Sequence, residues 1–219
     1  MSRSNVNLHA HTVYSDGSKT VAEVVDALRS AGIDTFSITD HDTVAGNTEA
    51  AELARQLGMR YIKGVEISCI YNGEGGLYDN YHCHILGYGF DSDKMREALK
   101  TLRAYVAYPT IQEGIKLVQD CGGLAVWAHP FHPIYRHLIT LPNAKLKQIA
   151  KAMESYGLDG IEAYYQMSHP AHIAFKCELA KQYGWLKTAA TDYHGDGPLS
   201  YLSFDKEGIT ADVTLLDKL

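Results

Sequence analysis

The sequence predicts an α/β protein in which short apolar strands alternate with amphipathic helices. The chain has 219 residues, of which 46% are hydrophobic, and this is enough for one domain with a sizeable buried core. Seven apolar segments alternate with segments of helical period, without a linker or an internal repeat, so we expect a single domain over residues 1–219. Seven strands favour a closed or nearly closed barrel, although an open doubly wound sheet would produce a similar pattern.

The expected strands are short runs of apolar and β-branched residues bounded by turn formers. They cover residues 6–9, 35–39, 61–67, 82–88, 124–128, 160–165 and 186–191. The third and fourth strands are joined by a segment rich in Gly, Asn and Tyr that has no helical period. Because parallel neighbours need a long and usually helical crossover, this segment predicts a hairpin and an antiparallel pair.

Helix boundaries follow from capping boxes, which start helices, and from glycines, which end them. Two Thr-x-x-Glu capping boxes begin at Thr20 and Thr110. A third helix start is expected at Asp42 or Thr43, and Pro170 suits the first turn of the last helix. The expected helices extend over residues 20–31, 43–57, 93–106, 110–121, 143–156 and 170–183.

Composition and charge exclude several classes of protein. The net charge of −6 argues against a broad surface for duplex nucleic acid or anionic membranes. The longest segment without Asp, Glu, Lys or Arg, Cys121–Tyr135, contains two prolines and two histidines and is no membrane span. The first residues lack an apolar signal core, and the 4 cysteines form no CxxC pair. We therefore expect a cytoplasmic protein with reduced thiols.

The chain has 11 histidines, and several of them stand with acidic residues at the ends of predicted strands. His9 and His11 are two residues apart, so both imidazoles of a strand would face the same way. Glu162 also lies in a strand, and Asp40 precedes His41 and could orient an imidazole. The candidate metal ligands are His9, His11, Asp16, His41, Glu66, His84, His129, Asp192 and His194.

Imidazole and carboxylate ligands without thiolates suit zinc, manganese or iron. Nine such groups are more than one tetrahedral ion can use, so they predict two or three divalent ions bridged by a carboxylate. Buried histidines with backbone partners would explain one or two of these positions, but they would not place His, Asp or Glu at five separate strand ends.

The ordered motifs resemble those of the PHP family (polymerase and histidinol phosphatase) over residues 5 to 196. The matching segments are His9-Ala-His11-Thr12, Thr39-Asp40-His41-Asp42, Gly64-Val65-Glu66, Ala128-His129-Pro130 and Thr191-Asp192-Tyr193-His194. The resemblance implies a distorted seven-stranded β/α barrel, similar to a TIM barrel, with a trinuclear metal site. It is closest to the stand-alone metal-dependent phosphoesterases, including members that hydrolyse nucleotides or trim short RNA.

The resemblance also implies which residues share each ion. The first ion would bind His9, His11, Glu66 and Asp192, and the second would bind Glu66, His84 and His129, with Glu66 as the bridge. The third ion would bind Asp16, His41 and His194. Some relatives have His in place of Asp16, and the extra negative charge here means that their metal identity does not transfer.

Two features depart from the family pattern. The short segment between residues 90 and 121 leaves no room for a sizeable insertion domain. The arginine that relatives often carry after the His-Pro motif is missing, and Phe131-His132 stands there instead. His132 or Arg136 could replace it in binding phosphate, and His169 matches a histidine that relatives place near the substrate phosphate.

The expected activity is hydrolysis of a phosphate ester of a small molecule, a nucleotide or a short oligonucleotide. A metal-bound hydroxide would attack phosphorus, and the ions would neutralise the phosphoryl oxygens. Glu66 and Asp192 would act at the metal centre, and His169 would bind the phosphate or protonate the leaving oxygen. The alternatives are a small-metabolite phosphatase, such as one for histidinol phosphate, and a non-catalytic metal-binding module accessory to a polymerase.

Overall fold

The computed structural model describes residues 5–71, 81–103, 108–131, 143–165, 168–196 and 214–219. Its strands are β1 (Val6–Asn7), β2 (Thr35–Phe36), β3 (Arg60–Tyr61), β4 (Gly64–Tyr71), β5 (Tyr81–Tyr88), β6 (Leu124–Trp127), β7 (Gly160–Tyr165) and β8 (Leu186–Ala190). Its α-helices are α1 (Val21–Ser30), α2 (Asn47–Leu57), α3 (Ser92–Arg103), α4 (Ile111–Asp120), α5 (Asn143–Ser155) and α6 (Pro170–Tyr183). The predicted alternation of strands and helices is confirmed.

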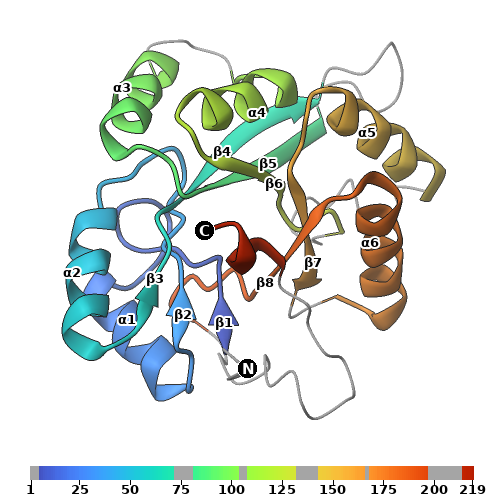
Figure 1. The fold of residues 1–219 in the computed structure, drawn as a ribbon. Coiled ribbons are helices and arrows are strands. Elements are labelled where there is room, and N and C mark those ends of the chain that lie inside the picture. The colour runs from blue at the N-terminus through green and yellow to red at the C-terminus, as the bar shows by residue number, and fades with distance from the viewer. Residues whose placement is uncertain (1–4, 72–80, 104–107, 132–142, 166–167, 197–213) are drawn as a thin grey trace.

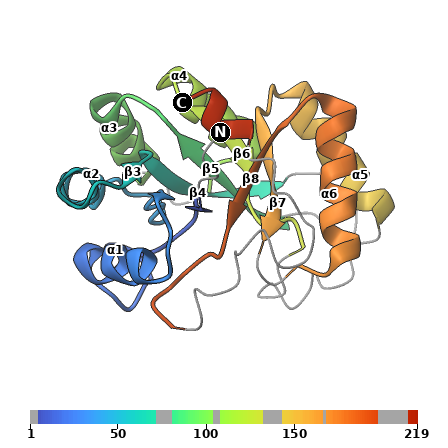
Figure 2. The same cartoon turned by 60° about the horizontal axis from the view of Figure 1, so that its bottom comes forward.

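The strands form two sheets with helices packed around them (Figures 1 and 2). One sheet has the order β1-β2-β3 and is parallel, and the other has the order β4-β5-β6-β7-β8 and is mixed. The β4 and β5 strands pair antiparallel from Gly64 opposite Tyr88 to Tyr71 opposite Tyr81, as their connecting segment predicted. This pairing brings the beginning of β5 to the same edge as the carboxyl ends of the parallel strands β6, β7 and β8.

The single seven-stranded barrel expected from the sequence is not confirmed, since the described residues form eight strands in two sheets. The expected third strand, 61–67, is divided between β3 and β4, which pair in different sheets. The strands β1 and β2 pair over only two residues each. Beyond this pairing, backbone amides donate hydrogen bonds to side-chain oxygens. The His9 amide donates to Asn7 Oδ1 at 3.3 Å, and the Ala10 amide donates to Thr39 Oγ1 at 3.1 Å.

Most helix boundaries match the sequence prediction. Both capping boxes form, at Thr20 and Thr110, and α6 has the predicted limits. The predicted cap of the second helix at Asp42 or Thr43 is wrong, because α2 begins after Gly46. Asp42 instead adopts a φ of 52° and accepts a hydrogen bond from the Ser68 amide at 3.0 Å, so its side chain holds β4 in place.

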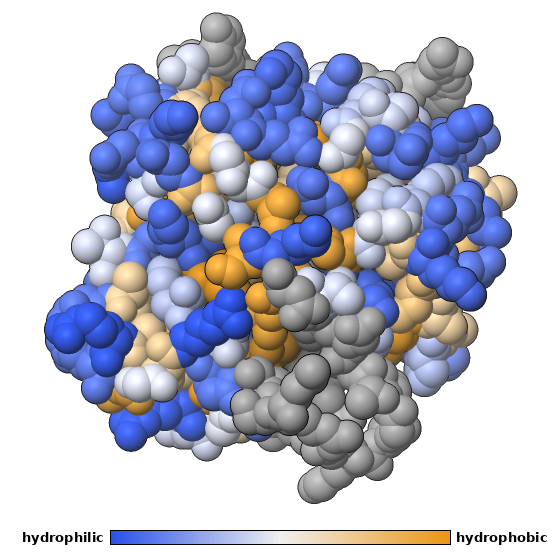
Figure 3. All heavy atoms as spheres, viewed as in Figure 1, coloured by the Kyte–Doolittle hydropathy of each residue, from blue (hydrophilic) through white to orange (hydrophobic). Residues whose placement is uncertain are grey.

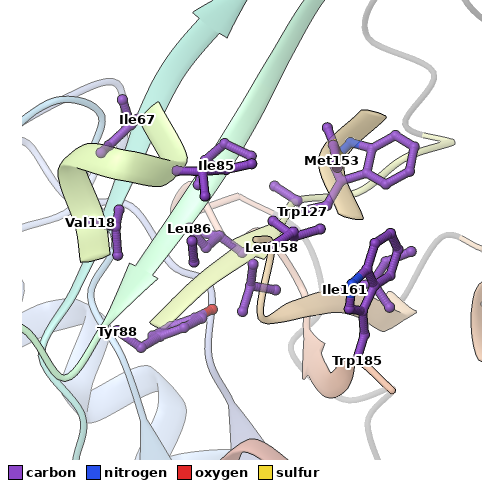
Figure 4. Close-up of a cluster of buried hydrophobic side chains, with 14 of the residues drawn as sticks. Ile67, Ile85, Leu86, Tyr88, Val118, Trp127, Met153, Leu158, Ile161 and Trp185 are labelled. Carbon is purple, nitrogen blue, oxygen red and sulfur yellow. The ribbon is translucent and has the colours of Figure 1, made fainter. Parts of the chain in front are cut away.

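Two hydrophobic clusters support the sheets. The larger one lies between the five-stranded sheet and helices α4, α5 and α6, and the smaller one lies between α1, α2 and the first sheet. Figure 4 shows the larger cluster, with Val118 of α4 near β4 and β5 and Met153 of α5 beside Trp127. The four cysteines are free thiols, as expected, and Cys69, Cys83 and Cys121 are buried.

The C-terminal 3-10 helix Thr214–Asp217 lies against the five-stranded sheet. The Thr214 hydroxyl accepts a hydrogen bond from the Lys187 amide at 3.0 Å, and Arg60 donates to the Leu216 carbonyl at 3.3 Å. The surface in Figure 3 is mostly hydrophilic, with hydrophobic side chains showing in its middle, where this helix lies in Figure 1. No helix among the described residues has the length and apolar character needed to cross a membrane.

Close packing of α4 on β4 depends on a glycine inside the helix. A Cβ atom built at Gly114 would collide with the Cys69 sulfur. Replacing an exposed helical glycine by alanine usually stabilises a helix by about 1 kcal/mol. We expect the opposite for Gly114→Ala, a loss of about 1–3 kcal/mol in the free energy of unfolding, because the added methyl overpacks the interface.

Urea unfolding measures this effect. The matched control is Gly114→Ala combined with Cys69→Ala, which removes the colliding sulfur and should recover part of the loss. A stability of Gly114→Ala equal to or above that of the wild type would contradict the packing described.

Candidate metal centre

Four side chains from distant parts of the chain converge at one buried point. His9 Nε2 lies 3.0 Å from Glu66 Oε2 and 3.2 Å from Asp192 Oδ1. His11 Nε2 lies 3.0 Å from the same Glu66 oxygen and 3.1 Å from the same Asp192 oxygen. The two Nε2 atoms are 3.0 Å apart. The segment after β1, the strand β4 and the segment after β8 therefore build one compact set of donor atoms.

This set fits a tetrahedrally coordinated divalent cation. Ligand atoms at about 2.0–2.2 Å from such an ion stand roughly 3.3–3.6 Å from one another. The five separations given above, 3.0 to 3.2 Å, are close to this spacing. Two imidazole nitrogens and two carboxylate oxygens are also the mixture that zinc, manganese and iron accept.

The second oxygen of Glu66 faces a different pair of histidines. His84 Nδ1 lies 2.8 Å and His129 Nε2 lies 3.0 Å from Glu66 Oε1. His41 Nδ1 lies 3.4 Å from Glu66 Oε2, and His41, Glu66 and His84 form a second group that could hold an ion. The sequence predicted Glu66, His84 and His129 for the second ion. The structure adds His41 to these residues.

A third group gathers around Asp16 at the mouth of the site. Its carboxylate lies 3.3 Å from His11 Nδ1, 3.6 Å from His41 Nε2 and 3.3 Å from His194 Nε2. The Asp16 side chain is 53% exposed, whereas those of Glu66 and His9 are fully buried. The rings of His11 and His194 stack with centroids 4.2 Å apart, so this group continues directly into the first one. All nine predicted ligands therefore lie in one connected cluster.

Burial and opposite charges shift the pKa values of these groups strongly. Burial disfavours the charged forms of His9 and Glu66, but their mutual attraction outweighs it. The pKa of His9 is raised well above its usual value by Glu66, Asp192 and Glu162, and that of Glu66 is lowered well below its usual value by the surrounding histidines. The pKa of Asp192 is likewise lowered, against its burial, mainly by His9 and His11. The cluster keeps its carboxylates ionised, as ligands of cations must be.

Two of the predicted ligands have backbone conformations that are unusual for residues with side chains. His129 has a φ of 24° and Asp192 has a φ of 56°, in or near the left-handed region. Strain of this kind persists only where the surrounding structure enforces it, and it clusters at functional sites. Here it turns both side chains from the ends of β6 and β8 toward Glu66 and His9.

Asp40 supports the site through the turn that contains Thr12 and Ser15. Its buried carboxylate accepts hydrogen bonds from the Thr12 amide at 2.7 Å, the Thr12 hydroxyl at 2.8 Å and the Ser15 hydroxyl at 2.7 Å. These bonds hold the turn that carries His11 and Asp16. The sequence predicted that Asp40 could orient an imidazole, whereas the hydrogen bonds found among the described residues join it to Thr12 and Ser15.

The sequence did not assign a role to Glu162 or to Lys176, which both lie beside the centre. Glu162 Oε1 lies 3.1 Å from His9 Nδ1. Lys176, on α6, is fully buried, donates to Ser168 Oγ at 3.0 Å and lies 6.0 Å from the Tyr165 ring centroid. Burial lowers the pKa of Lys176 to about 8, against the opposing charge of Glu162. A lysine on an otherwise apolar helix face is the only sequence signal that could have marked this residue.

The predicted substrate residues are less well supported by position. His169 is the exposed N-cap of α6, and its Nδ1 accepts a hydrogen bond from the Ala171 amide at 3.2 Å. Among the described groups that could hold an ion, none includes His169. His132 and Arg136 lie outside the described residues. The roles of all three residues toward phosphate remain predictions.

The α/β fold and this cluster of imidazoles and carboxylates define a metal-dependent hydrolase. The chain belongs to the PHP family, since the family model of the PHP domain matches residues 7–215. The resemblance inferred from the motifs is thereby confirmed, and with it the expectation of an enzyme of the phosphoesterase class.

Curated relatives with known names act on different phosphate esters. The phosphoribosyl 1,2-cyclic phosphate 1,2-diphosphodiesterase of Eggerthella lenta is 26% identical over 86% of this chain and 94% of its own length. The 5'-3' exoribonuclease of Haemophilus influenzae is 34% identical over 51% of this chain. The 3',5'-nucleoside bisphosphate phosphatase of Chromobacterium violaceum is 33% identical over 45% of this chain. The matches to the last two cover only 39% and 33% of those proteins.

Solved structures show the same fold. A metal-dependent phosphoesterase candidate from Bifidobacterium adolescentis matches with a TM-score of 0.74 at 22% identity, over 90% of both chains. An amidohydrolase from Chromobacterium violaceum, solved with bound sulfate, matches with a TM-score of 0.75 at 20% identity, over 89% of both chains. The overall arrangement of strands and helices is therefore shared with these solved structures.

The stability of the metal-free protein should depend on pH through His11. Burial opposes the charged form, but hydrogen bonds to Asp192 and Glu66 raise its pKa from 6.5 to about 9. Because the pKa of His11 is higher in the folded state than in the unfolded state, protonated His11 stabilises the folded state fully at pH values below 6.5. This stabilisation is lost as the pH rises through about 9. We expect the free energy of unfolding to fall by about 1–3 kcal/mol between these two pH values.

Urea unfolding in the presence of a chelator, at a series of pH values, measures this change. The control is His11→Gln, which lacks the titrating group and should show a smaller dependence over the same range. A wild-type stability that stays constant or increases from neutral to alkaline pH would contradict the charge arrangement described.

Proposed function

We propose that this protein hydrolyses phosphate esters, as a phosphomonoesterase or phosphodiesterase, with a centre of two or three divalent ions. The single observation that carries the proposal is the position of Glu66. Its two oxygens face two different sets of imidazoles, with contacts of 2.8 to 3.0 Å to His9, His11, His84 and His129. A carboxylate in this position suits a bridge between two cations.

The proposed ligand sets are those that the family resemblance implies, and the distances given above support them. The first ion is held by His9, His11, Glu66 and Asp192. The second is held by Glu66 and His84 with His129, and His41 lies within reach of the same group. The third is held by Asp16, His41 and His194. Zinc, manganese and iron are all compatible with these ligands.

The chain's own residues would bind the ions, orient the substrate and manage protons. When bound, such ions would supply positive charge for the phosphoryl oxygens and lower the pKa of a water molecule. Glu66 and Asp192 would hold them through ionised carboxylates, and His9 and His11 would do so through neutral imidazoles. His169 at the start of α6 is the proposed contact to the phosphate or to the leaving oxygen. Tyr165, whose hydroxyl lies 3.5 Å from Asp192 Oδ2, adds a further polar group to the centre.

The proposed substrates are phosphorylated small molecules, nucleotides or short oligonucleotides. Support comes from the named activities of the relatives, which cover a cyclic phosphodiester, a nucleoside bisphosphate and RNA. The relative that matches along nearly its whole length acts on a phosphoribosyl cyclic phosphate, which favours compact ribose-containing esters.

We further infer that the whole chain acts as one domain, and that the two sheets are parts of one distorted barrel. Backbone hydrogen bonds cross both junctions between the sheets and support this view. The Leu8 amide donates to the Ala189 carbonyl at 3.1 Å, and the Asp42 amide donates to the Glu66 carbonyl at 2.8 Å.

A phosphatase panel run with manganese, zinc and iron tests the function. We expect metal-dependent turnover of a generic aryl phosphate and preference for a ribose-containing ester over histidinol phosphate. Elemental analysis of protein purified without a chelator should show two or three ions per chain. A stoichiometry of one or less that reconstitution does not increase would contradict the multinuclear centre, and absence of turnover with every metal would favour the accessory module.

Replacing Glu66 tests the bridge. We expect Glu66→Gln to remove most activity at saturating metal, because a neutral amide cannot neutralise two cations. We expect the activity of Glu66→Gln to fall by more than the ~100-fold that is typical when an enzyme loses one charged contact to the transition state. Turnover of the variant beside the wild type measures this, with Glu97→Gln as the control, an exposed residue of α3 that does not belong to the cluster. Near-normal turnover of Glu66→Gln would show that Glu66 is not the bridge.

Replacing His169 tests the proposed phosphate contact. We expect His169→Ala to lower kcat/KM by ~100-fold or more while the metal content stays unchanged. His132→Ala is expected to have a smaller effect. Full retention of kcat/KM would reduce His169 to the helix cap that the structure shows, and loss of metal would make it a ligand.

A further inference from the structure

Glu162 on β7 contacts two of the proposed ligands at once. Its side chain is fully buried. Oε1 lies 3.1 Å from His9 Nδ1, and Oε2 accepts a hydrogen bond from the His129 backbone amide at 2.8 Å. His9 belongs to the first proposed set of ligands and His129 to the second. The Glu162 carboxylate therefore contacts one residue of each set, at atoms that do not face Glu66.

The contact with His9 determines which nitrogen of its ring can bind a cation. An ionised carboxylate only accepts hydrogen bonds, so the proton of a neutral His9 must lie on Nδ1, where it faces Glu162. This leaves the lone pair on Nε2, which is the atom that faces Glu66 and Asp192 at 3.0 and 3.2 Å. The opposite tautomer would place a proton between the ring and the cation.

The contact with His129 acts on the backbone. His129 follows the carboxyl end of β6 and has a φ of 24°, which is a costly conformation for a residue with a side chain. The hydrogen bond from its amide to Glu162 Oε2 stabilises this conformation, and the turn directs the ring toward Glu66, where Nε2 lies 3.0 Å from Oε1. Without this acceptor, a buried amide would lose its partner.

We propose that Glu162 is a positioning residue that sets the tautomer of His9 and the backbone of His129, and thereby couples two metal subsites. The proposal rests on the metal centre of the proposed function. It assigns Glu162 no contact with substrate and no place among the ligands.

An amide at position 162 cannot replace the carboxylate. Glutamine has the same shape, but it offers one acceptor oxygen and one donor nitrogen. If its oxygen accepts the His129 amide, its nitrogen faces His9 Nδ1 and enforces the wrong tautomer. If its oxygen faces His9, its nitrogen opposes the His129 amide. Either orientation damages one of the two subsites.

Zinc titration of the chelator-treated protein tests the proposal in Glu162→Gln, Glu162→Asp and the wild type. The matched control is Asp159→Asn. Asp159 precedes β7 and its Oδ2 accepts the Ala125 backbone amide at 2.8 Å, so it ties the same pair of strands together away from the metal centre. We expect Glu162→Gln to bind at least one zinc equivalent ~10–100-fold more weakly, which is the usual effect of losing such a supporting group. Glu162→Asp should retain part of the affinity, and Asp159→Asn all of it.

Nitrogen NMR of the zinc-loaded protein provides a readout that needs neither activity nor a variant. We expect the His9 proton on Nδ1 in the wild type. Zinc affinities of Glu162→Gln equal to those of the wild type, or a His9 ring protonated on Nε2 in the wild type, would overturn the role of Glu162. If Glu162→Gln does not fold, the wild-type spectrum decides by itself. A wild type that binds no zinc would instead contradict the metal centre and the proposed function.

Discussion

The burial of one carboxylate among several imidazoles is the constraint on which the rest of the structure depends. Glu66 is fully buried on β4, and four imidazole nitrogens approach its two oxygens within 3.0 Å. Removing an ionised carboxylate from water costs several kcal/mol, and only close opposite charges and hydrogen bonds offset this cost. The segments around Glu66 must therefore place imidazole side chains next to its carboxylate.

The arrangement of strands follows from that demand. The ladders of β1 and β2 end after two residues, and the segments that follow them carry His9, His11 and His41. The antiparallel pairing of β4 with β5 places Ser68 opposite His84, which brings a histidine from the start of one strand close to a glutamate of the other. A wholly parallel sheet would have carried His84 to the opposite edge.

Carboxylates that lie behind the ligands complete the centre. Asp40 holds the turn with His11 and Asp16 through three hydrogen bonds, and Glu162 contacts His9 and His129. Such supporting groups orient ligands before any ion binds, which lowers the cost of assembling the site. The unusual φ values of His129 and Asp192 are tolerated in this setting because the surrounding contacts hold both residues in place.

The sequence by itself determined the class of fold, the capping boxes at Thr20 and Thr110, the antiparallel β4–β5 pair and the nine side chains that converge in one cluster, whose role as metal ligands is a prediction. These features are local, since they depend on turn formers, on strand alternation and on the types of side chain at strand ends. The second helix start was mispredicted because Asp42 uses its carboxylate on Ser68, a partner distant in sequence.

Only the tertiary structure decided how the strands divide into two sheets, and which atoms meet. The histidines divide into sets that face different oxygens of Glu66, and His41 lies near the second set as well as near Asp16. Both results depend on the positions of side chains from several segments of the chain, which the sequence does not give. The contacts of Glu162 and Lys176 were also decided by the tertiary structure. The position of Lys176 on an otherwise apolar helix face indicates burial, but its place next to the centre results from the packing of α6 on β7.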